Sequence, residues 1–139
     1  MKKLFSTKTS DTSFTIATLL LRLGFGGLML VNYGWHKLTH YAEMQRQVGD
    51  PLGLGPTVSL ALVVFAEFFC SAFVILGLFT RLACIPLIIA MGVAFFKVHH
   101  MIYSTGQHSG QTALIFFLAF LIILFTGPGK VSLDRLIGK

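Results

Sequence analysis

The sequence predicts an all-α integral membrane protein, a four-helix bundle with both termini on the cytoplasmic side. Three observations predict this fold: an apolar composition, four continuous apolar stretches and an uneven distribution of positive charge. The 139 residues are 55% apolar and only 12% charged, and their mean hydropathy is +0.80. A soluble domain carries about 25% charged residues. The chain therefore has too little polar material to cover a water-facing surface.

Four stretches are long enough to cross a bilayer, which takes roughly 20 helical residues. The predicted spans cover about residues 14–35, 58–79, 82–100 and 110–127. Their apolar runs are continuous rather than alternating, which favours helices over the strands of a β-barrel. We expect the spans to form one membrane domain over residues 1–139.

Positive residues lie mainly on one side of the predicted membrane. Seven lie on the side shared by the termini and the turn between the second and third spans, and three lie on the other side. The two groups are Lys2, Lys3, Lys8, Arg81, Lys130, Arg135 and Lys139, against Lys37, Arg46 and Lys97. The positive-inside rule therefore places both termini in the cytoplasm and predicts a multi-pass protein of the bacterial inner membrane.

The connection at about residues 37–57 is expected to form an outer loop, because glycines and prolines interrupt it. Tyr41, Met44 and Val48 recur at helical spacing near its start, which indicates a short interfacial helix. The formal charge of +6 does not indicate nucleic-acid binding, since the basic residues lie at the ends of apolar runs and form no basic face.

Two ionisable residues, Arg22 and Glu67, fall inside predicted spans, where such residues are costly. Counting from the span ends places them within a few residues of the same depth, so we expect them to meet. They would form an interhelical ion pair that fixes the bundle, or Glu67 would serve as a proton acceptor or as an anchor for a polar head group, and these roles are compatible. Tyr33 and His36 share the helical face of Arg22 and are expected to line its outer end.

The remaining polar residues suggest weaker candidates for ligand binding. All five histidines fall on the predicted outer side, and the spacing of His36 and His40 allows a metal or haem site as well as an interfacial role. Lys97 is expected to reach towards the membrane surface, and Gln111 to hydrogen-bond across the bundle. Cys70 and Cys84 lack any CxxC spacing, which predicts packing residues rather than a disulfide or zinc site.

Several segments, taken together in order, resemble the DoxX family of small four-helix membrane proteins. They are LLLRLGFG at 19–26, YGWHKL at 33–38, AEFFCSAFVILGLFTR at 66–81 and TGPGKVSLDRL at 126–136. By this resemblance the family's helix-one arginine falls on Arg22, its GxxK element on Gly34 and Lys37, and its helix-two glutamate on Glu67. Its inner-turn glycine and arginine fall on Gly77 and Arg81. The closing GPG…SLD falls on Gly127, Pro128, Gly129, Ser132, Leu133 and Asp134. The chain departs from the pattern at Tyr33, where members often have histidine, and at Gln111, where many have an acidic residue.

The resemblance implies a quinone- or thiol-redox-associated inner-membrane subunit that acts with a partner oxidoreductase, since the family includes subunits linked to sulfur oxidation with quinone as acceptor. The chain would then be at most one subunit of an enzyme. The candidate catalytic residues are Glu67, Arg22 and Tyr33, and the candidate cofactor-binding residues are Lys37, His36, Lys97 and Gln111. The cofactor is not determined by the sequence; quinone, haem and a metal are the candidates, and no residue is assigned as a metal ligand. The alternatives are a non-catalytic scaffold for other membrane subunits or for a homo-oligomer, and a small-solute or proton transporter.

Overall fold

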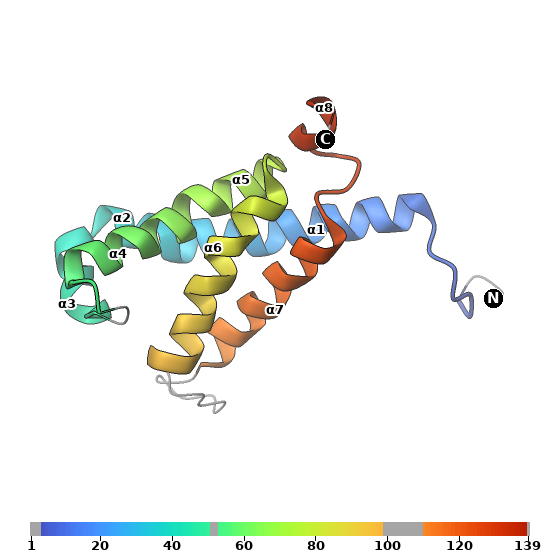
Figure 1. Cartoon of the computed structure of the whole chain (residues 1–139). Coiled ribbons are helices and arrows are strands. Elements are labelled where there is room, and N and C mark those ends of the chain that lie inside the picture. Colours follow the sequence, from blue (N-terminus) through green and yellow to red (C-terminus); the bar gives the residue numbers. More distant parts are fainter. Residues whose placement is uncertain (1–3, 51–52, 99–109, 139) are drawn as a thin grey trace.

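A computed structural model describes residues 4–50, 53–98 and 110–138, and every regular element in these ranges is helical (Figure 1). In chain order the elements are α1 (Asp11–Met29), η1 (Leu30–Gly34), α2 (Trp35–Thr39), α3 (Tyr41–Val48), α4 (Pro56–Val64), η2 (Phe65–Cys70), α5 (Ser71–Leu76), α6 (Thr80–Val93), η3 (Ala94–Val98), α7 (Gln111–Thr126) and α8 (Leu133–Leu136). The three η segments are π-helical and continue neighbouring α-helices without a break.

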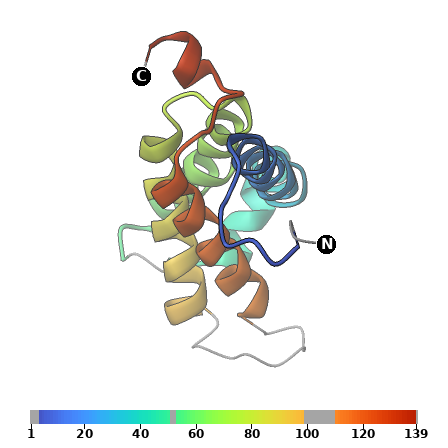
Figure 2. The ribbon, with the colours of Figure 1, turned by 90° about the vertical axis from the view of Figure 1, so that its right-hand side faces the viewer.

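The helices form two pairs that cross each other. The continuous helix α1–η1–α2 lies beside α4–η2–α5, and α6 and α7 form a hairpin packed across them (Figure 1). In Figure 2 α1 is seen end-on while α6 and α7 run down the view, so the hairpin is steeply inclined to α1. The first turns of α1 project beyond the end of α5 (Figure 1).

The apolar helices begin and end within a few residues of the predicted spans. Asp11–Thr39, Pro56–Leu76 and Thr80–Lys97 are long and apolar enough to cross a membrane, and Gln111–Thr126 is a shorter apolar helix. The first helix is longer than expected at both ends. It begins at Asp11 because the Ser10 hydroxyl caps it by accepting a hydrogen bond from the amide of Ser13. The last two residues of the predicted third span lie outside the described residues.

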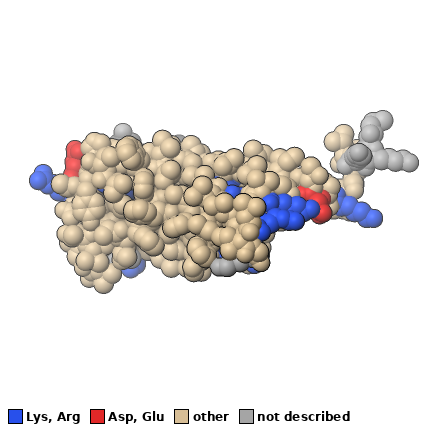
Figure 3. Space-filling model, turned by 90° about the horizontal axis from the view of Figure 1, so that it is seen from above, with Lys and Arg blue, Asp and Glu red and all other residues tan. Residues whose placement is uncertain are grey.

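The surface has the character of a membrane protein. On the face shown in Figure 3, charged residues gather towards the two ends of the molecule and a broad uncharged region lies between them. Large apolar side chains such as Leu20, Ile89 and Ile122 are well exposed on the helices. Such exposure suits hydrocarbon rather than water. Which end faces the cytoplasm stays a prediction from the positive-inside rule.

The short helix predicted near the start of this loop is present as α3, and its place at the membrane interface stays a prediction. Met44 is buried against Leu60 and Val64, and the Tyr41 hydroxyl donates to the carbonyl of Thr57 at 2.8 Å. The loop behind it is organised by Asp50, whose carboxylate accepts hydrogen bonds from the hydroxyl of Ser59 and from two backbone amides. The hydrogen bond from Ser59 and those from the amides hold the pKa of Asp50 below its ordinary value.

The core joins all four membrane helices. Fully buried side chains such as Met29, Val74, Leu87 and Phe120 belong to one cluster. Cys70 and Cys84 are free thiols inside the same cluster. Their prediction as packing residues is confirmed.

Two glycines bring α1–η1 into close contact with the antiparallel helix beside it. A Cβ atom on Gly34 would lie 2.5 Å from the carbonyl oxygen of Glu67 and 2.8 Å from Cα of Phe68. A Cβ on Gly26 would lie 2.9 Å from Cγ1 of Ile75. Only a residue without a side chain allows this approach. The contact fixes the register, with Gly34 opposite Glu67 and Gly26 opposite Ile75.

We expect Gly34→Ala to destabilise the protein, because the added methyl group overlaps the backbone of η2. Such overpacking costs about 1–3 kcal/mol. Gly27→Ala is the matched control, since nothing lies within 4 Å of a Cβ at Gly27 and alanine is the better helix former. Thermal unfolding in lipid nanodiscs should show a lower Tm for Gly34→Ala and an equal or higher Tm for Gly27→Ala. Equal Tm values for both variants would contradict the close contact.

Candidate functional site

The register places a buried ion pair between the first two membrane helices. The Nζ atom of Lys37, on α2, donates to Oε2 of Glu67, on η2, at 2.5 Å. The side chain of Glu67 is 4% exposed and that of Lys37 is 16% exposed. Charges at this depth are stable only when paired. We take this pair as the centre of the candidate site.

Two π-helical segments face each other at the pair. η1 and η2 are in contact, and Gly34 at the end of η1 meets the backbone of Glu67 within η2. A π-helical segment widens one turn of a helix and re-aims its side chains, and such segments are frequent at functional sites. Lys37 follows Gly34 by about one turn, so its side chain extends to the carboxylate opposite.

Tyr33 lies beside the pair, as its predicted role requires. Nζ of Lys37 is 5.8 Å from the centre of the Tyr33 ring, within the range of a cation–π interaction. The ring packs edge-on against Phe116 of α7, with 5.7 Å between the ring centres. The Tyr33 hydroxyl has no hydrogen-bond partner within the described ranges. Tyr33, Lys37 and Glu67 therefore form one cluster of polar groups in apolar surroundings.

The expected meeting of Arg22 and Glu67 is wrong. Arg22 is buried but lies beside Gly77, since a Cβ on that glycine would be 2.6 Å from Nη2 of Arg22. Gly77 is ten residues beyond Glu67, which is about 15 Å along a helix. Counting from the span ends failed because the glycine contacts stagger the two helices and leave the first turns of α1 projecting beyond α5.

Arg22 instead binds the backbone where helices end. Its guanidinium donates to the carbonyls of Val74 at 3.0 Å and Ile75 at 2.8 Å, near the end of α5. It also donates to the carbonyls of Pro128 and Val131, in the segment that follows α7. Helix ends leave such carbonyls without their usual i→i+4 partners, and the Val74 carbonyl accepts from the amide of Gly77 as well. Arg22 thus ties α1, α5 and the closing segment together.

Asp134 completes this connection and was not among the predicted site residues. Its carboxylate accepts from the amides of Phe79 at 2.7 Å and Thr80 at 3.0 Å, and from the Thr80 hydroxyl at 2.9 Å. It therefore caps the start of α6 from the far end of the chain. Its own amide donates to the carbonyl of Gly77. The SLD sequence contains the residue, but no local pattern shows which helix it caps.

The other predicted binding residues lie outside the cluster. The rings of His36 and His40 are exposed and stacked, with centres 4.6 Å apart. Among the described residues no group of three metal-binding side chains is found. Lys97 is exposed on η3, and Gln111 is the exposed first residue of α7. His99, His100 and His108 lie outside the described residues.

Comparison with known proteins agrees with the sequence resemblance. The family model described as DoxX matches residues 17–100. The inner membrane protein YqjF of Escherichia coli is 27% identical over 95% of this chain and 97% of its own length. A second inner membrane protein of that organism, YphA, is 29% identical over 78% of this chain and 81% of its own length. An uncharacterized membrane protein of Mycobacterium tuberculosis is 28% identical over 81% and 77% of the two chains. No solved structure matches the chain.

We expect Lys37 and Glu67 to be strongly coupled in stability. Lys37→Met should cost about 3–5 kcal/mol, because it leaves a buried carboxylate without its partner, whereas Lys37→Met combined with Glu67→Leu should cost much less. Chemical unfolding in mixed micelles measures both values and the coupling between them.

The surface pair Lys130–Asp11, with 3.0 Å between Nζ and Oδ2, provides the matched control. Its side chains are 50% and 88% exposed, so Lys130→Met should cost less than about 1 kcal/mol. Additive effects of the Lys37 and Glu67 substitutions would show that the two groups do not interact in the membrane.

Proposed function

The chain belongs to the DoxX family and is a multi-pass protein of the bacterial inner membrane, and on this premise we propose that it is a quinone-associated redox subunit that acts with a partner oxidoreductase. The observation that carries the proposal is the buried Lys37–Glu67 pair with Tyr33 beside it. Ionisable residues inside a membrane domain are expensive and usually serve a function.

The cost of the pair argues for a role beyond packing. A buried ion pair can usually be replaced by apolar side chains of similar size without loss of stability. The neighbouring packing of Tyr33 against Phe116 shows that apolar contacts already hold the helices together at this level. A chemical role for the pair accounts for both its charges and its buried position.

The groups in the cluster fit the needs of a quinone. Reduction of a quinone takes up two electrons and two protons and converts its two carbonyls to hydroxyls. The ammonium of Lys37 and the hydroxyl of Tyr33 are hydrogen-bond donors for a carbonyl, and the Lys37–Glu67 pair holds an exchangeable proton. The electrons come from the partner subunit, through a flavin, haem or iron–sulfur group. Arg22 is occupied by backbone carbonyls, so its proposed contribution is to position α1.

The cysteines favour quinone over a thiol substrate. A thiol-redox reaction carried by this chain would need an accessible cysteine. Both of its cysteines are buried in the core cluster, Cys84 completely. Thiol chemistry would therefore have to reside in the partner.

A second candidate function is a scaffold for other membrane subunits. The internal connections of Arg22 and Asp134 favour it, because these charges bind backbone groups and hold helix ends in place. In this account the Lys37–Glu67 pair would be one more structural connection.

We expect the protein purified with native lipids to retain quinone, detectable by extraction and redox spectroscopy. Glu67→Gln keeps the size of the side chain but removes its charge, and Lys37→Met removes a donor. Each should lower quinone retention about tenfold or more, as expected for loss of a charge-assisted hydrogen bond. Asp11→Asn is the control outside the site and should retain quinone normally.

The scaffold account predicts the opposite pattern. Wild-type protein would carry no quinone but would co-purify in a stable complex with another membrane protein. That result would overturn the quinone proposal.

A further inference from the structure

We propose that a groove along α6 binds an anionic phospholipid from the leaflet on the side of the termini, with its acyl chains in the apolar part and its phosphate at Arg81. This proposal does not depend on the quinone proposal. It concerns the opposite end of the membrane helices from Lys37.

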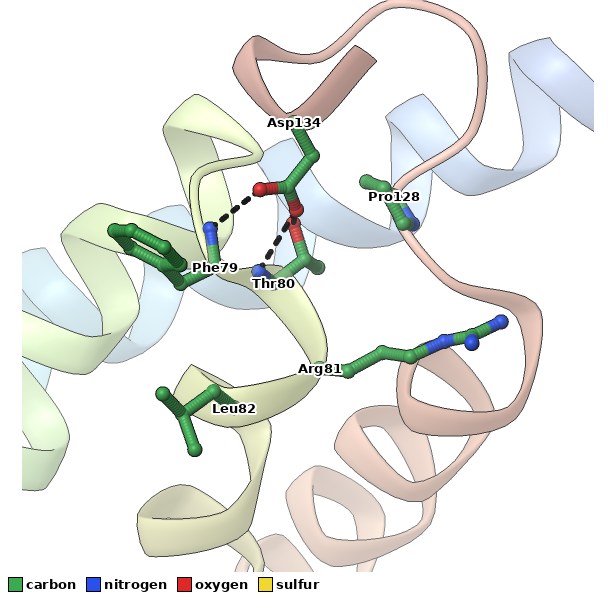
Figure 4. Close-up of a pocket in the computed structure, with 6 residues that line it drawn as sticks. All are labelled: Phe79, Thr80, Arg81, Leu82, Pro128 and Asp134. Atoms are coloured by element: carbon green, nitrogen blue, oxygen red, sulfur yellow. Dashed lines mark hydrogen bonds between the residues drawn. The ribbon is translucent and has the colours of Figure 1, made fainter. Parts of the chain in front are cut away.

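The groove consists of three hollows in line. The first, of about 270 Å³, lies between α4–η2 and α6, and the second, of about 350 Å³, lies between η2–α5 and α6. Phe65 and Pro86 line both of them. The third, of about 320 Å³, lies at the start of α6 and shares Phe79 and Leu82 with the second (Figure 4). The shared residues show that the hollows adjoin one another along α6.

The chemistry of the groove changes along its length. Among the residues that the structure describes, no charged one lines the first two hollows, whereas the third adds Thr80, Arg81 and Asp134. A groove that is apolar along its length and polar at one end fits an amphiphile better than a fully apolar or a fully water-soluble molecule. The polar end lies where the apolar run of α6 begins, which is the level of lipid phosphates.

Arg81 is the group available for a phosphate. It is exposed, and within the described ranges its side chain makes no hydrogen bond or ion pair. Its guanidinium lies near the end of α7, where a Cβ on Gly127 would be 3.1 Å from Nη2 (Figure 4). The planar guanidinium of arginine suits two-point binding of a phosphate.

The carboxylate of Asp134 does not cancel this attraction. It points at Phe79 and Thr80 and accepts three hydrogen bonds from them (Figure 4). Two of the donors are backbone amides at the start of α6, where the helix dipole also offsets negative charge. Arg22 lies close enough to contribute a favourable charge interaction with the same carboxylate. The net charge offered to a ligand in the third hollow is therefore positive.

The surrounding charge favours the anionic headgroup. Lys130 and Arg135 lie on the closing segment beside the third hollow's Pro128 and Asp134. Basic residues at a membrane surface attract anionic lipids. Charge complementarity at Arg81 and the apolar length of the groove together specify a phospholipid as the occupant.

Native mass spectrometry of the full-length protein in detergent, titrated with phosphatidylglycerol or phosphatidylcholine, tests the proposal. We expect wild-type protein to bind phosphatidylglycerol more tightly. Arg81→Met should weaken that binding about tenfold and remove the preference over phosphatidylcholine, whose phosphate contacts the same guanidinium but whose choline offsets the charge. Arg81→Lys should recover most of the preference. Arg46→Met is the control for loss of one positive charge, because Arg46 is exposed on α3 at the other end of the molecule, and it should behave like wild type.

Three outcomes would overturn the proposal. They are equal binding of the two lipids by wild-type protein, unchanged phosphatidylglycerol binding by Arg81→Met, and an equal loss for Arg46→Met. Soluble glycerol phosphate separates a lipid site from a simple phosphate site. It should not compete with phosphatidylglycerol, and effective competition would show that the groove plays no part.

Discussion

The close contact between Gly34 and the backbone of Glu67 is the constraint on which the rest of the structure depends. It fixes how far α1 is displaced along its neighbour. That displacement sets Lys37 beside Glu67 at one level and Arg22 beside Gly77 at another. In a membrane, helices gain nothing from hiding apolar surface, so close backbone packing and polar contacts decide their register. One residue without a side chain thus determines which charges meet.

The charged residues then divide into two kinds of connection. Arg22 and Asp134 bind backbone groups at the end of α5 and the start of α6, where helices leave carbonyls and amides without their usual i→i+4 partners. Lys37 and Glu67 bind each other, and the hydrogen bond between them does not cap a helix end. The first kind holds the fold together. The second leaves a pair of ionisable groups for chemistry, which is why the quinone proposal rests on it.

The helical fold could be predicted from the sequence because it depends on composition and on the length of apolar runs. The positions of Arg22 and Glu67 as buried charges could also be predicted. Their partners could not, since the register comes from the contact at Gly34 rather than from distances to span ends. The cap formed by Asp134 could not be predicted from local sequence patterns either, because Asp134 lies 54 residues after Thr80.

Solid-state NMR in bilayers tests the central claim most directly, by measuring the dipolar coupling between ¹⁵N-labelled side-chain nitrogens and the labelled carboxyl carbon of glutamate. The account predicts a strong coupling from a lysine Nζ that disappears in Glu67→Gln, and none from an arginine guanidinium. A coupling between the Glu67 carboxylate and the Arg22 guanidinium would contradict it.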